Sequence, residues 1–375
     1  MWMEQLVSGW LALELTDSAW LVAVNGFFRM APLLIIGFIS GAIADRFGRR
    51  RVILFSQTIN LLVPAILLLL VLTKQIRFWH LPVASAIIGS VWALDWPTRR
   101  SLLPDLVGKE RVTEGILLEG VFQNIARIVG PYAAGVIIEY LGASGCFAVL
   151  ALLSAIGLII LFGLSKPPRH AEGERPSRIS VKESVRYIVQ KQSILGVLLV
   201  SVVMNLLFFP HATLLPVFAR DILGQGSVGL GLMSAGYGIG AFMGLVLLNR
   251  IRRMWQQNRI FVAGSAFQAA LLVLFAFSTS FPLSVAALVL AGLGQASFAV
   301  LQSSIVLGSA SDKLRSRTMG MLNLSIGVGA LGRMQMGAIA SSFGAPLAVG
   351  LSCIAAILLM LLIITVLPGF RKKEM

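Results

Sequence analysis

Runs of about 20 apolar residues recur along almost the whole chain, and they constrain its fold more than any other feature. Of its 375 residues, 57% are hydrophobic and 13% are charged, which lies well outside the average for soluble domains. A helix of about 20 apolar residues crosses roughly 30 Å of hydrocarbon, whereas the strands of a membrane barrel are shorter and alternate in polarity. The sequence therefore predicts an all-α integral membrane protein.

Twelve such segments can be delimited, and we expect each to be a transmembrane helix. One long polar stretch at 165–192 divides them into six and six. This predicts an N-terminal six-helix half at 1–164, a cytoplasmic linker at 165–192 and a C-terminal six-helix half at 193–375. The segments are 1–15, 19–43, 52–73, 80–98, 113–139, 143–164, 193–219, 227–249, 259–279, 283–307, 317–340 and 345–368.

The basic residues gather in every second connection between these segments. Connections rich in Lys and Arg stay on the cytoplasmic side of a membrane, so we expect both termini in the cytoplasm and the protein in the inner (plasma) membrane. A net charge of +15 could also suggest nucleic-acid binding, but the alternating pattern is typical of membrane topology. We therefore expect the lipid bilayer as a partner and no nucleic acid. Of 31 Lys and Arg, 25 lie in 46–51, 99–111, 166–191, 250–259, 313–317 and 371–373.

The first segment is shorter than a full span. Fifteen residues at 1.5 Å each cover about 22 Å, and no basic residue precedes them. We interpret this as a first helix truncated at its N-terminus, and we expect an upstream in-frame segment of about 10–25 apolar and basic residues.

The linker divides into two parts. Pro167, Pro168 and Pro176 mark its first part as irregular. Ser180 and Glu183 have the spacing of a capping box, so the second part is predicted to be an amphipathic helix on the inner leaflet that joins the two halves.

Glycines at matching positions indicate an internal repeat. Their offset of about 202 residues relates the fifth and sixth segments to the eleventh and twelfth, as expected for two related halves. The matched pairs are Gly130 with Gly332, Gly135 with Gly337 and Gly142 with Gly344.

The connection between the second and third segments reads GAIADRFGRRRVI (41–53). We expect its glycines to allow a tight turn and its arginines to hold it at the cytoplasmic face. A solvated basic loop would explain the arginines but not the spacing of glycine and aspartate. The pattern of Gly41, Asp45, Arg46, Gly48 and Arg49 resembles the signature loop of the major facilitator superfamily of transporters.

Further segments resemble the secretion-effector branch of that superfamily, which includes enterobactin exporters and macrolide efflux proteins. These are WLALELT (10–16), WPTRRSLLPDLV (96–107), ARIVGPYAAG (126–135) and FPHATLLPVFARDILGQG (209–226). The resemblance implies two pseudo-symmetric halves, alternating access, and export of small molecules driven by a proton gradient without a cofactor.

The resemblance also assigns roles to individual residues. Asp95 stands where such proteins place a carboxylate that pairs with the loop arginine, here Arg49. Gly130 and Pro131 match part of the helix-5 motif of antiporters. The fourth segment has no arginine before Asp95, so the motif often linked to proton coupling is missing, and proton antiport is implied by kinship alone.

Charges at membrane depth need partners or a wet cavity. Glu4 and Arg29 lie about equally far from the short connection between the first two segments. We therefore expect them to pair near the midplane, with Asn25 one turn from Arg29. The pair could be purely structural, or it could bind protons or substrate.

A second polar group lies on the fifth segment, where Glu119, Gln123 and Arg127 follow an i, i+4, i+8 spacing on one helix face. Arg333 lies at a comparable depth in the eleventh segment. Three arginines at membrane depth would leave the interior net positive, which favours anionic or acceptor-rich amphiphiles as substrates.

Some polar and aromatic residues have two readings. His211 could titrate near neutral pH or simply pack beside Pro210. Tyr237 and the pairs Phe27–Phe28 and Phe208–Phe209 could line a binding chamber or pack between helices. The glycine-rich segment 229–244 is expected to let helices approach closely.

The remaining residue types argue against an enzyme. Cys146 and Cys353 have no metal-binding spacing, and the three histidines lie on unrelated segments. We expect no metal, no cofactor, and a monomer that works on a small-molecule substrate with protons. A non-transporting sensor or receptor on the same fold, or an uncoupled facilitator, remain the alternatives.

Overall fold

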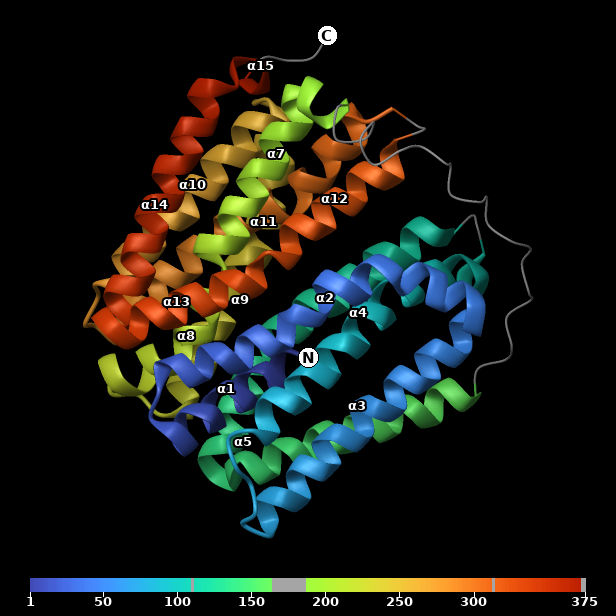
Figure 1. Ribbon diagram of the computed structural model, residues 1–375, viewed down its shortest axis with the longest axis vertical. Helices are drawn as coiled ribbons and strands as arrows, with labels where there is room; N and C mark the ends of the chain where they lie inside the picture. Colours follow the sequence, from blue (N-terminus) through green and yellow to red (C-terminus); the bar gives the residue numbers. More distant parts are fainter. Residues whose placement is uncertain (109–110, 164–186, 312–313, 372–375) are drawn as a thin grey trace. The chain divides into compact units, whose positions relative to one another are not determined.

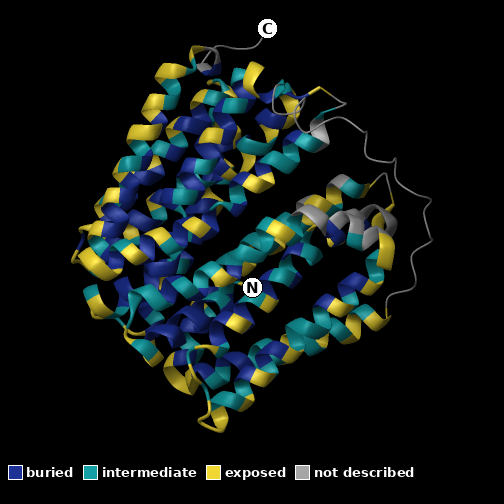
Figure 2. Cartoon of the chain, in the orientation of Figure 1, coloured by how far each residue is buried: buried dark blue, intermediate teal, exposed yellow. Residues whose placement is uncertain are grey.

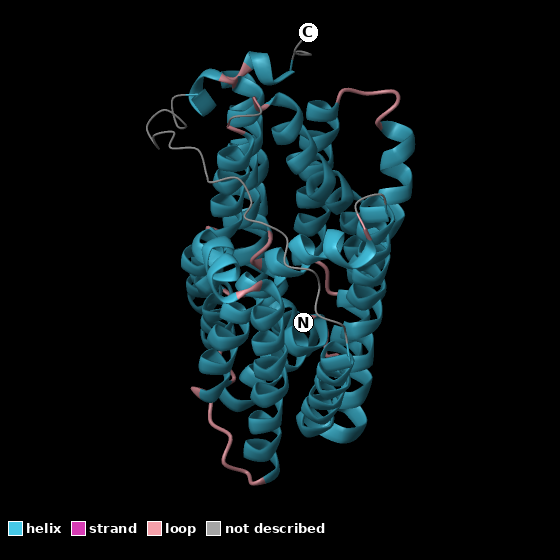
Figure 3. Ribbon diagram, turned by 90° about the vertical axis from the view of Figure 1, so that its right-hand side faces the viewer, coloured by secondary structure: helices cyan, strands magenta, loops and turns pink. Residues whose placement is uncertain are grey.

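The computed structural model describes residues 1–108, 111–163, 187–311 and 314–371, a few of them inside helices by their backbone alone. Every regular element in these ranges is a helix (Figure 3). The first five are α1 (Trp2–Thr16), α2 (Ala19–Phe47), α3 (Arg49–Leu72), α4 (His80–Val107) and α5 (Val112–Gly163). The next group is α7 (Gln192–Val203), the π-helical turn η2 (Met204–Phe208), α8 (His211–Val217), the π-helical turn η3 (Phe218–Ile222) and α9 (Ser227–Ile251). The last are α10 (Gln257–Ala276), α11 (Phe281–Ser309), α12 (Arg315–Gly327), α13 (Gly329–Phe343), α14 (Ala345–Val366) and α15 (Pro368–Arg371).

The chain forms two compact units. Unit 1 contains Met1–Ala171 and Leu215–Ala235, and unit 2 contains Glu172–Leu214 and Gly236–Met375. The segment Leu215–Ala235 lies in the second half of the sequence but packs within unit 1, and the predicted division into two six-helix halves stays a prediction. Two helices, α8 and α9, therefore begin in one unit and end in the other.

Within unit 1, α2 runs along α4, α3 packs on α4 and α5, and α1 packs on α5 and α2 (Figure 1). Within unit 2, α10 packs against α11 and α14, and α13 packs against α14 and η2. Large apolar side chains stay exposed on many of these helices (Figure 2), for example Ile35 at 72% and Ile159 at 71%. Apolar surface on this scale suits lipid rather than water.

Eight helices among the described residues are long and apolar enough to cross a membrane. One of them, α5, changes direction at Gly142, which has a φ of 67°, so its two arms correspond to the predicted segments 113–139 and 143–164. Because α1 has only 15 residues, it falls below the length of a full span. The arrangement with twelve spans remains a prediction.

The glycine repeat coincides with matching local structure. Gly142 and Gly344 both have positive φ, 67° and 84°, and each breaks the helix between two spans. A Cβ on Gly130 would contact Trp2 of α1. One on Gly332 would collide with the backbone of Leu206 in η2. The same position of the fifth and eleventh spans therefore contacts the first and the seventh.

The predicted loop at 41–51 is largely helical, which corrects the sequence interpretation. Helix α2 continues to Phe47 and α3 begins at Arg49, so Gly48, with φ 87°, is the turn. Gly41 lies within α2 and makes no turn. The apolar run ends before the helix does, because charged residues continue a helix readily once it leaves the hydrocarbon.

The predicted linker helix with its Ser180–Glu183 capping box lies outside the described residues. Just after it, the amide of Ser311 donates to the Tyr187 hydroxyl at 3.0 Å. This contact places the end of the linker beside the C-terminal end of α11.

Candidate functional site

An ion pair lies inside unit 1 between the first two helices. Arg29 Nη1 is 2.8 Å from Glu4 Oε2, and the two side chains are 10% and 7% exposed. The predicted pairing is therefore confirmed. The two atoms are not aligned as a hydrogen bond, so the attraction is mainly Coulombic. It arises because α1 and α2 run antiparallel from a turn at Asp17, whose φ is 49°.

A hydrogen-bonded chain one turn from this pair links α1, α2 and α4. Asn25 Nδ2 donates to Ser8 Oγ at 3.0 Å, and Ser85 Oγ donates to Asn25 Oδ1 at 2.8 Å. All three side chains are buried. Helix α4 comes this close because Gly89 faces the backbone of Arg29, where a Cβ would collide with the carbonyl oxygen. The predicted Asn25 thus connects three helices, while Ser8 and Ser85 were missed.

The predicted polar face of α5 points toward α1 and α4. Glu119 Oε2 is 3.6 Å from Arg100 Nε, and the Arg127 guanidinium lies 4.7 Å from the centre of the Trp2 ring, a cation–π distance. Gln123, one turn from each, is half-buried. These contacts place the face against protein rather than lipid.

Arg333 occupies a buried position in α13. Its Nη1 donates to the carbonyl of Gly329 at 3.0 Å, one turn earlier in the same helix. Arg29, Arg127 and Arg333 therefore all have favourable contacts, with a carboxylate, a ring and a carbonyl. The expectation of an anionic or acceptor-rich substrate, which rested on a net positive interior, stays a prediction.

Asp95 pairs within its own helix. Its Oδ2 is 2.5 Å from Arg99 Nε, and Arg99 Nη2 donates to Gln57 Oε1 of α3 at 3.3 Å. Gln57 Nε2 in turn donates to the carbonyl of Ser154 in α5 at 3.0 Å. Sequence reasoning missed Arg99, although its i+4 spacing from Asp95 is a recognised signal. The pair of Asp95 with Arg49 remains a prediction.

The loop residues are described unevenly. The side chain of Asp45 lies outside the described part of the chain. The Arg46 guanidinium lies 5.7 Å from the centre of the Phe47 ring. The loop is anchored to α5 by Arg50, whose Nη2 donates to the carbonyl of Phe162 at 3.4 Å.

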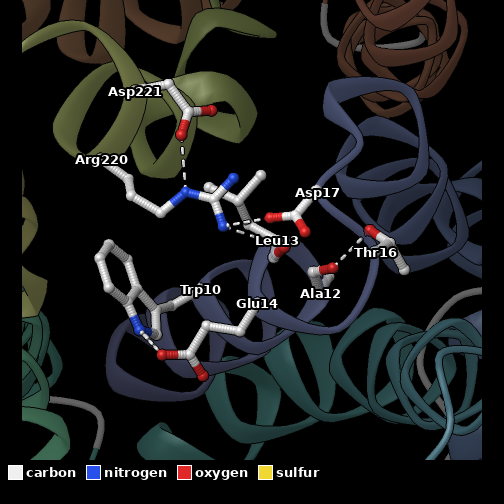
Figure 4. A network of polar contacts seen from close by, with 8 residues as sticks. All are labelled: Trp10, Ala12, Leu13, Glu14, Thr16, Asp17, Arg220 and Asp221. Carbon is white, nitrogen blue, oxygen red and sulfur yellow. Dashed lines mark hydrogen bonds and ion pairs between the residues drawn. The ribbon is translucent and has the colours of Figure 1, made fainter.

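A second charged contact closes the opposite end of α1 (Figure 4). Arg220 of η3 places Nη1 at 2.8 Å from Asp17 Oδ1, and Nη1 also donates to the carbonyl of Leu13 at 3.3 Å. Its Nε donates to Asp221 Oδ1 at 2.6 Å. A cation suits the C-terminal end of a helix, where carbonyls are unpaired. No periodicity in the sequence indicates this contact, because its partners are about 200 residues apart.

The segment Leu215–Ala235 is held in unit 1 by a helix crossing as well. Ser227 Oγ donates to the carbonyl of Gly135 at 2.8 Å. A Cβ on Gly231 would lie only 2.8 Å from the Pro131 carbonyl oxygen. Pro131 of the predicted helix-5 motif is thus part of the surface of α5 on which the start of α9 packs.

A helical bundle with exposed apolar faces and a buried ion pair is typical of a membrane protein, and solved structures share its fold. A POT family transporter in complex with 5-aminolevulinic acid superposes with a TM-score of 0.78 over 99% of this chain and 95% of that one, at 12% identity. The chain belongs to the transmembrane secretion effector family, which it matches over residues 1–375.

Two relatives support the same class. The multidrug efflux pump Tap of Mycolicibacterium fortuitum is 25% identical over 98% of this chain and 91% of its own length. The staphyloferrin A transporter of Staphylococcus aureus is 25% identical over 72% of this chain and 69% of its own length. Both are transporters of small molecules, and this chain is similar to them.

Proposed function

We propose that this protein is a secondary active exporter that exchanges small amphiphilic molecules for protons by alternating access, with Glu4 as the proton-binding residue. The observation that carries this proposal is the buried Glu4–Arg29 pair. A carboxylate in a poorly solvated site is either paired with a cation or protonated. A proton that binds Glu4 therefore competes with Arg29 for the same oxygens.

Competition for Glu4 also sets the direction of coupling. A donor group of a substrate, such as an amine or a hydroxyl, competes with a proton for the carboxylate, and mutual exclusion produces exchange. A substrate that instead competes with Glu4 for Arg29 would release the Glu4 carboxylate to take up a proton. Substrate and proton would then cross the membrane in the same direction. Export driven by inward proton flow therefore favours a substrate with donor groups.

In this proposal the contacts that hold Leu215–Ala235 in unit 1 break and re-form during the transport cycle. The segment contains the end of α8 and the start of α9, and the other ends of both helices belong to unit 2. A motion between the two units must therefore separate the segment from one of them. The Arg220–Asp17 contact and the Ser227–Gly135 hydrogen bond are the interactions that would break. By the positive-inside rule these residues lie at the outer ends of their helices, with both termini in the cytoplasm.

The loop at 41–51 would act on the cytoplasmic side. In this proposal it holds that side closed in the outward-facing state, through Asp45 and an Arg49–Asp95 pair, while two six-helix halves rock about the central site. Asp45→Asn or Arg49→Ala should then impair turnover and leave expression and ligand binding largely intact. Wild-type transport rates in both variants would refute this role.

Transport in proteoliposomes tests the coupling. Ethidium, a cationic amphiphile with amine donors, is loaded and an inward proton gradient is imposed on wild type, Glu4→Gln and Glu14→Gln. Glu14 is the matched control, since it lies on the same helix but is exposed. We expect gradient-driven efflux in wild type and Glu14→Gln. In Glu4→Gln we expect ethidium binding and passive exchange without gradient dependence.

Two outcomes would contradict the proposal. Full gradient-driven efflux by Glu4→Gln would leave Glu4–Arg29 as a structural pair. Efflux by wild type that is independent of the gradient would identify an uncoupled facilitator.

A further inference from the structure

Three polar side chains from three helices meet inside unit 2. The Tyr237 hydroxyl of α9 lies 3.3 Å from Gln268 Oε1 of α10 and 3.2 Å from Gln295 Oε1 of α11. A hydroxyl has a single proton, so it cannot donate fully to both amide oxygens. Both distances exceed the ~2.7–2.8 Å of a good O–H···O hydrogen bond. The two amide oxygens therefore compete for one hydroxyl proton.

Gln268 has hydrogen-bonding capacity that the cluster does not use. The side chain is fully buried, and its Nε2 has no hydrogen-bond partner among the described residues. Flipping the amide would exchange its two ends, so that Nε2 donates to the Tyr237 oxygen and Oε1 is left over. In either orientation one end of a buried amide is unpaired, which typically costs about 1–3 kcal/mol. Buried amides are otherwise nearly always paired.

Glycines hold the three helices close together around this cluster. A Cβ on Gly292 of α11 would collide with the carbonyl oxygen of Tyr237. A Cβ on Gly294 would collide with the carbonyl oxygen of Gly264 and would lie 3.0 Å from Gln268 Cβ. The cluster therefore lies where the backbones of α9, α10 and α11 are in direct contact, and its geometry is rigid.

Tyr237 and Gln295 form a partly accessible rim beside the buried glutamine. Their accessible side differs from the exposed apolar face of each helix. The exposed Ile239 and Val246 follow Tyr237 by about half a turn and two and a half turns, so they lie on the opposite side of α9. The exposed Val300 follows Gln295 by nearly one and a half turns and likewise lies on the far side of α11. The rim therefore does not share the face that suits lipid.

An aromatic ring borders the cluster. The His211 ring lies 5.9 Å from the Tyr237 ring, and its Nδ1–H donates to the carbonyl of Phe208 at 2.7 Å.

We propose that Tyr237, Gln268 and Gln295 form a binding site for an uncharged hydrogen-bonding group, a hydroxyl or an amide, of the transported molecule. The trio consists of a phenol and two amides, all uncharged, so we expect the recognised group to be neutral. This site rests on the proposed transport function and adds the chemistry of its substrate.

Equilibrium binding to purified protein, without any gradient, tests the site. The probes are chloramphenicol, which is uncharged and has two hydroxyls and an amide, and tetraphenylphosphonium, which is charged and has no hydrogen-bonding group. Tyr237→Phe removes only the hydroxyl, and Gln295→Met repeats the test at the rim. Tyr140→Phe is the control, because Tyr140 is 79% exposed on α5.

We expect both site variants to weaken chloramphenicol binding about tenfold, the loss of roughly one hydrogen bond. Tetraphenylphosphonium binding should change less than about twofold, and Tyr140→Phe should bind both probes like wild type. Unchanged chloramphenicol binding, equal weakening of both probes, or a wild type that does not bind chloramphenicol would each overturn the site. Glu4→Gln efflux fails or succeeds independently, because it reports the use of the gradient and not hydrogen bonding at Tyr237.

Discussion

The cluster around Glu4 in unit 1 and the cluster around Tyr237 in unit 2 use different chemistry. In unit 1, Glu4 and Arg29 place opposite charges 2.8 Å apart, and Asn25 has partners for both ends of its amide. In unit 2, the phenol and amides around Tyr237 are uncharged, and Gln268 leaves one end of its amide unpaired. A buried charge without a partner costs far more free energy than a buried neutral amide with one end unpaired. This difference is what the two proposals predict, a proton at the Glu4 cluster and a neutral hydrogen-bonding group at the Tyr237 cluster.

The largest effect should come from breaking the charged pair. Arg29→Leu leaves Glu4 buried without its cation, and we expect a loss of about 3–5 kcal/mol in unfolding free energy. The double variant Glu4→Leu with Arg29→Leu removes both charges and should regain most of that loss. Thermal unfolding in detergent, with Glu14→Gln as control, measures both. A double variant as unstable as the single one would mean that packing, not charge, distinguishes unit 1.

Close helix contacts should matter equally in both units. Gly89→Ala in unit 1 and Gly292→Ala in unit 2 each drive a Cβ into a backbone carbonyl, so each should lower stability by about 1–3 kcal/mol. Gly120→Ala and Gly308→Ala are matched controls, because a Cβ there meets nothing within 4 Å. Chemical denaturation would compare the four. A much larger effect in one unit would show that the two differ in packing as well as in polarity.

Removing an amide should have unequal effects. Asn25→Leu leaves the hydroxyls of Ser8 and Ser85 without their partner, and we expect a loss of about 1–3 kcal/mol. Gln268→Leu also removes an unpaired buried end, so its loss should be smaller, below about 1 kcal/mol. The ratio of the two, from thermal unfolding, sharpens the comparison. A more severe Gln268→Leu would show that the Tyr237 cluster is a structural network rather than a binding site.

The smallest effect on stability is expected at the end of α1. Asp17 is 79% exposed, so Asp17→Asn should change unfolding free energy by less than about 1 kcal/mol, and less still at high salt. In the proposed alternating-access mechanism, labelling of Leu13→Cys by a membrane-impermeant thiol reagent should nevertheless increase when Asp17 is replaced, because this helix end loses its contact with Arg220. Unchanged labelling at low and high salt would argue against an ion-pair closure.

Much of the fold and part of the site could be predicted. Apolar length located most helices within about four residues, although α4 ends at Val107 rather than at 98, and Gly142 marked the break in α5. The pairing of Glu4 with Arg29 followed from equal distances to one short turn, because adjacent antiparallel helices preserve depth. The loop at 41–51 was predicted too long, since the end of an apolar run is not the end of a helix. The i+4 partner of Asp95 was missed because the family resemblance drew attention to Arg49.

The sequence by itself determined that this is a helical membrane protein and which charged residues lie within its apolar helices. It also determined that Glu4 and Arg29, on neighbouring helices, pair with each other. These properties depend on composition and on separations of a few tens of residues. Only the tertiary structure decided that Leu215–Ala235 packs within unit 1, that Arg220 binds the end of α1, and that Tyr237, Gln268 and Gln295 converge. Contacts between distant segments depend on how glycine-lined helix faces fit together. The sequence of one helix does not determine which other helix packs against it.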